Sequence, residues 1–319
     1  MTKPLRPTSQ MAAPLVLDQA FDDPEAVLDL VRRGAPYKTQ EAAHKHPNVE
    51  RTGGWFRNFW ALGGKVVFDG AEPFFHNPTF IDAARSSFAA KVIRPVAMMT
   101  NLNLPAAGLP PHLDLPFFRG AMNREVPAWM LAPMGYSGLF HDWAVPVASV
   151  VTWFYDGEGG EFEYWPGGLD APSETIRPPF HNKGVLADNE YMFHRVGAVG
   201  RREDWLAPNA VPYHARLHLE GDALAMRDGD QTLETFATEN VRLSILWKAY
   251  CFRSEADAQA FDDRSDDLNP HLIASLFLDD LSAKGIACTA PHDDFTDPEW
   301  QRVLEAAYPA PIPPERPQH

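Results

Sequence analysis

Short apolar runs separated by proline and glycine fill the middle of this 319-residue chain, from Val96 to Phe252. The main runs are VAMMTNLNL, VASVVTWFYD, GEFEYW, GVLADNEYMFHRV, ARLHLE, ALAMRDG and VRLSILWKAYCF. Runs of this length that are bounded by turn residues are typical of β-strands. The 30 prolines favour the same interpretation, because helix interiors do not accept proline whereas loops and strand ends do. We therefore predict a mainly β fold.

Helices are predicted on both sides of this β region. Pro24 begins one helix with EAVLDLVRRG, and Pro78 begins a second that ends near Ile93. After Arg253 three segments combine a capping residue with an apolar stripe, namely SEADAQAFDDR, NPHLIASLFLDDLSAKG and DPEWQRVLEAAYP. The expected architecture is thus a β core with flanking helices.

The same patterns divide the chain into three regions of one domain. Residues 1–94 are expected to form a helical and mixed region that packs on the core, residues 95–253 the core itself, and residues 254–319 a helical region. The two cysteines, Cys251 and Cys288, are too few for a disulfide scaffold and fit a reducing cytoplasm.

The net charge of -15 makes nucleic acid and anionic membranes unfavourable partners. No stretch of the sequence approaches the roughly 20 apolar residues that cross a bilayer, and the first residues lack the apolar segment of a signal peptide. We therefore expect a cytoplasmic protein without a membrane or nucleic-acid partner. The sequence does not indicate an oligomeric state.

His112 and Asp114 stand two positions apart in PPHLDLP, where the prolines keep the backbone extended. Residues i and i+2 of an extended segment project to the same side, so the imidazole and the carboxylate face together. Such a pair supplies two ligands of the two-histidine, one-carboxylate set that binds iron(II). With 12 histidines in the chain, about one such pair is expected by chance, so the spacing alone decides little.

Two further pairs share this spacing: His218 with Glu220, and His292 with Asp294. Neither is followed by a histidine in a predicted strand, because the later histidines lie in the helical end of the chain or in its tail. His194, by contrast, lies near the end of the apolar run GVLADNEYMFHRV, downstream of the first pair. We therefore predict that His112, Asp114 and His194 bind the metal.

The strand VRLSILWKAY places Arg242 and Ser244 on one face, because alternate residues of a strand share a side. A guanidinium beside a hydroxyl can hold a carboxylate through charge-assisted hydrogen bonds. The distal carboxylate of 2-oxoglutarate needs such a partner, and a solvated charge at a strand edge is the alternative interpretation.

Together these segments resemble the 2-oxoglutarate and iron(II) dependent oxygenase superfamily, in the branch of isopenicillin N synthase and the plant-type dioxygenases. The resemblance runs from MMTNLNLP through HLD, VVTWFYDGEGGEFEYWPGG and NKGVLADNEYMFHRV to RLS, and covers about Val96 to Phe252. It implies that residues 95–253 form a double-stranded β-helix, the jelly-roll core also found in cupins.

The resemblance also implies a reaction. Its cofactors and cosubstrates would be Fe(II), 2-oxoglutarate and O2, and its coproducts succinate and CO2. Hydroxylation of a small-molecule metabolite is the default outcome, with desaturation or ring formation as alternatives. Halogenation is disfavoured, because Asp114 occupies the position where the family's halogenases carry a small residue.

One interval departs from the family pattern, because 48 residues separate His194 from Arg242 and the family uses a much shorter spacing. We interpret residues 201–240 as an insertion, made of a loop and a hairpin that turns at 227–229 and could wall the mouth of the active site. Arg201 or Arg202 would fit the usual interval better, but both lie in a polar segment without a strand pattern.

Aromatic residues near the motifs are candidates for the walls of an apolar substrate pocket. These are Trp55, Phe56, Trp60, Phe117, Phe118 and Trp153, with Asn101, Asn103, Arg119 and Arg124 as polar anchors. Two other functions stay open. One is an Fe(II) oxygenase or oxidase that does not use 2-oxoglutarate, in which Arg242 and Ser244 hold the carboxylate of the substrate. The other is a cupin-like metal-binding protein or isomerase.

Overall fold

A computed structural model describes residues 12–45, 49–122, 125–291 and 295–310. Arg124, His292 and Asp294, which were considered from the sequence, lie outside the described residues. The larger of two facing sheets is antiparallel throughout, with the strand order β1-β10-β7-β16-β6-β4-β2-β13-β14-β15 and with β5 paired to β4. Its strands are β1 (Leu15–Leu17), β2 (Tyr37–Thr39), β4 (Trp55–Leu62), β5 (Lys65–Val66), β6 (Val92–Asn103), β7 (Val147–Tyr155), β10 (Phe180–Ala187), β13 (Arg216–Glu220), β14 (Ala223–Asp228), β15 (Gln231–Ala237) and β16 (Arg242–Phe252).

The smaller sheet has the order β11-β8-β9. It packs against the large sheet, because Phe162 and Tyr164 of the small sheet share an apolar cluster with Trp153 of β7. Its strands are β8 (Phe162–Trp165), β9 (Glu174–Ile176) and β11 (Phe193–Val196). A separate short pair joins β12 (Val211–Pro212) to β3 (Arg51–Thr52). Two facing antiparallel sheets whose strands alternate along the chain form the predicted jelly-roll, so the prediction of the fold class is confirmed.

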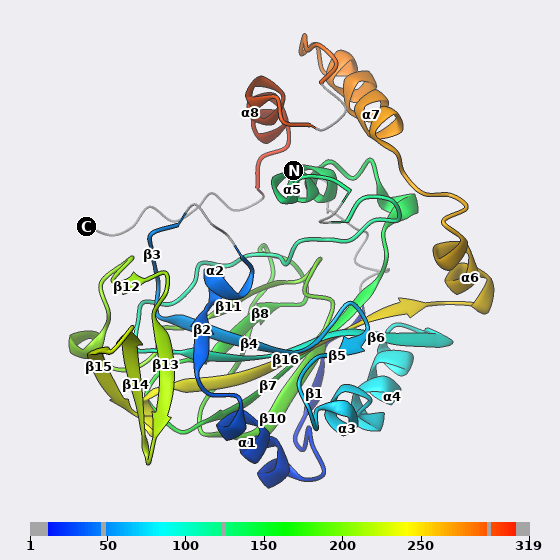
Figure 1. The fold of residues 1–319 in the computed structure, drawn as a ribbon. Helices are drawn as coiled ribbons and strands as arrows, with labels where there is room; N and C mark the ends of the chain where they lie inside the picture. Colours follow the sequence, from blue (N-terminus) through cyan, green and yellow to red (C-terminus); the bar gives the residue numbers. More distant parts are fainter. Residues whose placement is uncertain (1–11, 46–48, 123–124, 292–294, 311–319) are drawn as a thin grey trace.

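Helices cover the outer face of the large sheet and form a separate group beyond its end (Figure 1). On the outer face are α1 (Pro24–Arg33), α3 (Glu72–Phe75) and α4 (Pro78–Ser87), whereas the short α2 (Gln40–Ala43) lies on the other side of the sheet, where its C-cap His44 contacts Arg57. The separate group is α5 (Ala128–Ser137), α6 (Glu255–Asp263), α7 (Pro270–Ala283) and α8 (Pro298–Ala307), of which α5, α7 and α8 share one apolar cluster. No helix among the described residues is long and apolar enough to cross a membrane.

The alternation of β16 decides which of its side chains face the interior between the two sheets. Leu243, Ile245 and Trp247 lie in the main hydrophobic core, where Trp247 Nε1 donates to the carbonyl of Phe75 on α3 at 2.8 Å. The Trp247 indole also contacts the Phe80 ring of α4, with centroids 5.6 Å apart. The intervening residues of β16 therefore point away from the helices, into the space between the sheets.

Two predicted elements have different boundaries in the structure. The helix that begins at Pro78 ends at Ser87, not near Ile93, because Ala89 adopts a positive φ of 47° and Val92 already begins β6. The run GVLADNEYMFHRV is not a single strand. Its first part ends β10 in the large sheet, and its last part is β11 in the small sheet.

The inserted segment extends the large sheet. Strands β13, β14 and β15 form an antiparallel meander, and β13 pairs with β2 at the edge away from β1. The predicted turn is present, since β14 ends at Asp228 and Gly229 adopts a positive φ of 57°. This hairpin forms the far edge of the sheet beyond β4 and β2, and a role as a wall of the active-site mouth stays a prediction.

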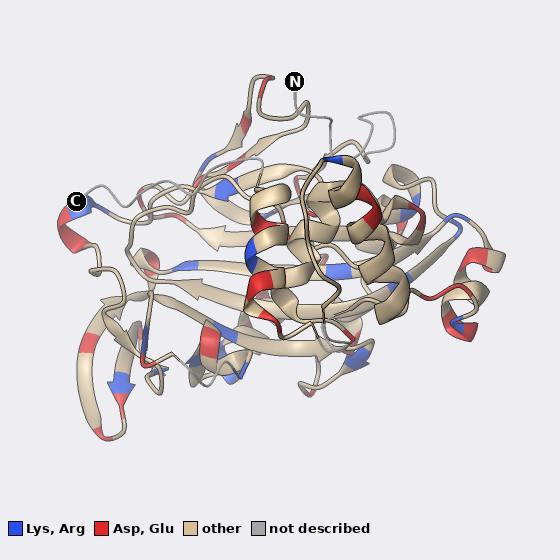
Figure 2. Ribbon diagram, turned by 90° about the horizontal axis from the view of Figure 1, so that it is seen from above, with Lys and Arg blue, Asp and Glu red and all other residues tan. Residues whose placement is uncertain are grey.

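Lys and Arg are scattered among Asp and Glu over the described part of the fold (Figure 2). Cys251 and Cys288 are both free thiols.

Candidate metal centre

His112 and His194 meet because the extended HLD segment pairs with β11. The two residues form an antiparallel bridge in which His112 N donates to His194 O at 3.0 Å and His194 N donates to His112 O at 3.1 Å. Opposite residues in such a bridge place their side chains on the same face. The ring centroids are 4.5 Å apart.

Both imidazoles are oriented by the backbone two residues earlier. The Nδ1 atom of His112 lies 2.9 Å from the carbonyl of Pro110, and that of His194 lies 3.1 Å from the carbonyl of Met192. A carbonyl can only accept, so each Nδ1 carries the proton and each Nε2 keeps its lone pair. This is the tautomer that metal-binding histidines use, with the second nitrogen bonded to a fixed acceptor.

His194 is buried, with 6% of its surface exposed. Burial lowers its pKa to about 4, against a weaker opposing effect of the Asp114 carboxylate. The ring is therefore neutral at physiological pH, which is the form that can bind a metal.

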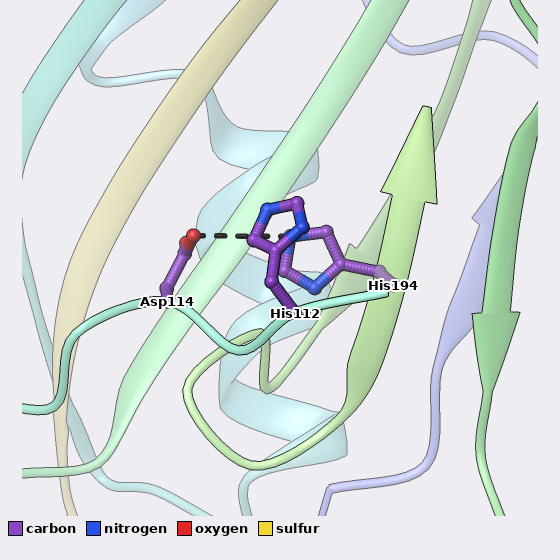
Figure 3. A group of neighbouring side chains, drawn as sticks. All are labelled: His112, Asp114 and His194. Atoms are coloured by element: carbon purple, nitrogen blue, oxygen red, sulfur yellow. Dashed lines mark ion pairs between the residues drawn. The ribbon is translucent and has the colours of Figure 1, made fainter. Parts of the chain in front are cut away.

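Asp114 completes the group from the same side of the HLD segment (Figure 3). Its backbone N donates to the carbonyl of Asn189 at 2.9 Å, and its Oδ1 lies 3.8 Å from His194 Nε2. One ligand atom from each of His112, Asp114 and His194 lies within 4.8 Å of the others. The structure thus brings the three side chains close together, and their binding of a metal stays a prediction.

Lys248 holds the other oxygen of this carboxylate, with Nζ 2.7 Å from Asp114 Oδ2. Burial alone would raise the pKa of Asp114, but Lys248 and the two imidazoles outweigh it and hold that pKa below its usual range. Burial opposes the charge of Lys248 too, yet Asp114 and Glu190 raise its pKa. The carboxylate is therefore ionised, with Oδ2 bonded to Lys248 and Oδ1 facing the imidazoles.

Lys248 was not predicted from the sequence, although a signal was present. It lies on the same face of β16 as Arg242 and Ser244, because all three occupy even positions of one strand. Extending the alternation of VRLSILWKAY by four residues would have identified it.

Arg242 and Ser244 both lie inside the fold, with 2% and 3% of their surfaces exposed. Arg242 Nε donates to the carbonyl of Gly160 at 2.7 Å, and its Cζ lies 5.8 Å from the centre of the Trp153 ring. Its Nη2 atom is buried without a hydrogen-bond partner among the described residues, and so is Trp153 Nε1. Burial lowers the pKa of Arg242 to about 10. A buried cation with unused donors fits an anionic ligand.

The alternative arginines do not share this environment. Arg201 is on the surface and pairs with Asp204, whose Oδ2 lies 3.0 Å from its Nε, and Arg202 is also exposed. The long interval between His194 and Arg242 is accounted for by strands β12 to β15, which are inserted before β16.

The candidates for pocket walls and anchors separate into two groups. Trp55, Asn101, Asn103 and Trp153 lie on the inner face, in register with Arg242 or Ser244 through β4, β6 and β7. Phe56 and Trp60 pack in the outer core, and Phe117 and Phe118 pack in clusters near the C-terminal helices. Arg119 is bound to Asp266, with Nη2 2.8 Å from Oδ2. These last five residues therefore do not line the candidate site.

No family model matches the chain, and no curated protein matches it. Several solved structures are similar to it. An oxidoreductase of the 2OG-Fe(II) oxygenase family from Burkholderia pseudomallei is 13% identical, with 75% of this chain and 84% of that chain covered and a TM-score of 0.41. A prolyl hydroxylase from Trichoplax adhaerens, in complex with a hypoxia inducible factor peptide fragment, is 12% identical, with coverages of 78% and 87% and a TM-score of 0.42.

A third similar structure is the non-heme alpha ketoglutarate dependent epimerase SnoN from nogalamycin biosynthesis. It is 12% identical, the alignment covers 76% of this chain and 81% of the SnoN chain, and the TM-score is 0.40. Likeness of this size leaves the chain's own residues as the basis for assigning a function.

Proposed function

We propose that this protein is a non-haem Fe(II) and 2-oxoglutarate dependent dioxygenase that oxidises a small-molecule metabolite. The observation that carries the proposal is that one ring nitrogen of each of His112 and His194 and one carboxylate oxygen of Asp114 lie within 4.8 Å of one another. Two histidines and one carboxylate on one face of the metal are typical of iron(II) oxygenases, because the opposite face stays open to cosubstrates.

The donor set fits iron(II) and differs from that of a structural zinc site or a magnesium site. A structural zinc site would use four protein ligands, most of them cysteine or histidine, and a magnesium site would use mainly oxygen. His112 and His194 would bind iron through Nε2 and Asp114 through Oδ1. Lys248 would keep Oδ2 engaged, so that the carboxylate presents a single oxygen.

Arg242 and Ser244 would hold the distal carboxylate of 2-oxoglutarate. The guanidinium is fixed at Nε by the carbonyl of Gly160, which leaves the buried Nη2 to donate. Bound iron(II) would supply dioxygen activation coupled to decarboxylation of 2-oxoglutarate, and the substrate would then be hydroxylated, desaturated or cyclised. The protein's contribution is to exclude water and to fix both anionic groups.

The test is spectroscopic and chemical. Iron(II) and 2-oxoglutarate, mixed with the protein under argon, should give a weak metal-to-ligand absorption band in the visible, and succinate should form after air is admitted. His194→Ala should show neither signal, because it removes one ligand. An iron-loaded wild-type protein that shows no band and forms no succinate would instead favour an Fe(II) oxygenase or oxidase that does not use 2-oxoglutarate.

The substrate and location also belong to this proposal. The predominance of acidic residues and the scattered basic residues favour a small molecule over a nucleic acid. The free thiols of Cys251 and Cys288 are compatible with the reducing cytoplasm.

A further inference from the structure

A second buried guanidinium, that of Arg57, lies inside the fold on strand β4. Its neighbour in register is Asn101 on β6, and Asn101 is in turn opposite Ser244 on β16. Arg57 and Trp55 share the inner face of β4, and the Arg57 Cζ lies 5.9 Å from the centre of the Trp55 ring. Only 9% of the Arg57 surface is exposed. The oxygenase assignment gives this arginine no role.

Two side chains fix the guanidinium of Arg57. Its Nε donates to Asn101 Oδ1 at 2.6 Å, and its Nη1 donates to His44 Nε2 at 2.5 Å. Both partners are uncharged acceptors in this arrangement, since an arginine can only donate. His44 caps the end of α2 and is exposed to solvent, so Arg57 lies directly beneath the surface.

Arg57 has no carboxylate within ion-pair distance among the described residues, and its Nη2 makes no hydrogen bond to them. Burial lowers the pKa of this guanidinium to about 10, and the more distant carboxylates of Asp114 and Glu41 only partly offset the effect. Burying a cation without a paired anion is unfavourable, so such a group is usually retained for a ligand.

Arg57 faces the same interior as the proposed cosubstrate anchor. The register places it across β6 from Ser244, with Asn101 between them, and Trp55 on the same strand is in register with Asn103, the partner of Arg242. An anion held by Arg57 would therefore lie on the inner face of the large sheet. Because Nε and Nη1 of Arg57 are already bonded, Nη2 is left to hold a single anionic group, and a guanidinium matches a carboxylate in geometry.

We propose that Arg57, positioned by Asn101 and His44, binds the carboxylate of the organic substrate, so that the enzyme acts on a monocarboxylic acid. The inference rests on the proposed function for the reaction itself. Arg242 would then bind 2-oxoglutarate in the interior, and Arg57 would bind the substrate nearer the surface. Arg242 is 2% exposed and has buried neighbours, which suits a cosubstrate that binds first, whereas Arg57 lies beneath solvent-exposed His44, where a substrate arrives.

The experiment compares monocarboxylic acids with their primary amides, which have nearly the same shape and no charge. A panel of such pairs, including aliphatic, aromatic and N-acylated amino acids, is titrated calorimetrically into the protein loaded with Mn(II) and 2-oxoglutarate. We expect at least one acid to bind at least tenfold more tightly than its amide. In Arg57→Gln the affinity for that acid should fall at least tenfold, while the affinity for the amide changes less than threefold.

Arg94→Gln is the matched control, because Arg94 is a surface arginine that pairs with Asp262 at 2.5 Å. It should bind the acid as the wild type does, and circular dichroism should show that both variants are folded. Arg57→Lys should recover part of the acid binding, since it restores the charge without the planar fork.

Three results would overturn the proposal. One is that no acid in the panel binds more tightly than its amide. Another is that Arg57→Gln weakens 2-oxoglutarate binding tenfold and leaves the acid unaffected, which would make Arg57 the cosubstrate anchor. The third is equal loss of acid and amide, which would indicate a structural role. Failure of the oxygenase assignment is distinct, because it abolishes the visible band and succinate formation in the wild type.

Discussion

Replacing Arg242 by methionine should separate the stability of the protein from its affinity for 2-oxoglutarate. Methionine keeps most of the length and flexibility of the side chain but removes the charge and all the donors. In the structure the guanidinium is 2% exposed and keeps Nη2 without a partner among the described residues. The substitution therefore removes both an unfavourable buried charge and the proposed anchor of the cosubstrate.

The expected magnitudes follow from the contacts of Arg242. Burial lowers its pKa to about 10, which corresponds to about 3 kcal/mol of unfavourable free energy for the charged form at neutral pH. The hydrogen bond from Nε to the carbonyl of Gly160 is lost in the variant, at a cost of about 2 kcal/mol. The free energy of unfolding should therefore stay within about 1 kcal/mol of the wild type, without cosubstrate.

The affinity for 2-oxoglutarate should change far more. Loss of a charge-assisted contact to the distal carboxylate corresponds to about 3 kcal/mol, or about 100-fold in Kd. Urea unfolding measures the first quantity, and titration of the visible band under argon measures the second. A variant that is several kcal/mol less stable but binds 2-oxoglutarate normally would show that Arg242 is a structural residue and would refute this reasoning.

Three further predictions concern other contacts. Lys248→Met should lower the free energy of unfolding by about 2 kcal/mol at pH 7, because it leaves the Asp114 carboxylate without its 2.7 Å partner. Lys248→Arg should retain most of the stability of the wild type in urea unfolding. An unchanged urea midpoint in the methionine variant would contradict the role of Lys248 as the partner of Asp114. The free energy of unfolding of the metal-free wild type should fall by about 3 kcal/mol relative to that of His194→Gln as the pH is lowered from 6.5 to about 4. The reason is that the imidazole is protonated in the unfolded chain over this range but stays neutral in the folded protein. Parallel curves of unfolding free energy against pH for the two proteins would contradict this prediction. Asn182→Ala should lower the free energy of unfolding by about 2 kcal/mol, measured by heat or urea, because the Asn182 side chain accepts from Phe21 N at 2.9 Å and donates to Phe21 O at 2.7 Å. Asn182→Asp keeps the accepting oxygen, so it should lower the free energy of unfolding by less.

The sequence predicted the strands well wherever the hydrophobic pattern was regular. The alternation in VRLSILWKAYCF and the run VASVVTWFYD gave β16 and β7 to within one residue at each end. It failed where one apolar run served two sheets. The change from β10 to β11 falls at the polar residues Asp188, Asn189 and Glu190, and the apolar residues on both sides of them led to the prediction of one continuous strand.

The candidate site was predictable only as far as spacing in the chain carries information. His112 and Asp114 share a side because two extended residues must, and that follows from local geometry. The contact of Lys248 with Asp114 joins residues 134 positions apart, and no local pattern specifies it. Aromatic residues were the poorest guide, since Phe56 and Trp60 occupy the same strand as Trp55 yet pack in the opposite layer.

The residues proposed to bind iron and 2-oxoglutarate and the residue proposed to bind the substrate come from different segments of the chain, which explains why the motifs indicate a reaction class and not a substrate. His112, Asp114, His194, Arg242 and Ser244 all lie within the segment that resembles known oxygenases, and each of them would contact iron or 2-oxoglutarate. Arg57 lies outside that segment, on a strand contributed by the N-terminal region and added to the edge of the core beside β6. A strand added there brings new side chains to the inner face without disturbing the metal-binding residues. Selection for a different substrate could therefore act on β4 and α2 alone, and exchanging these two elements between related proteins should transfer substrate preference while the iron and 2-oxoglutarate sites stay the same.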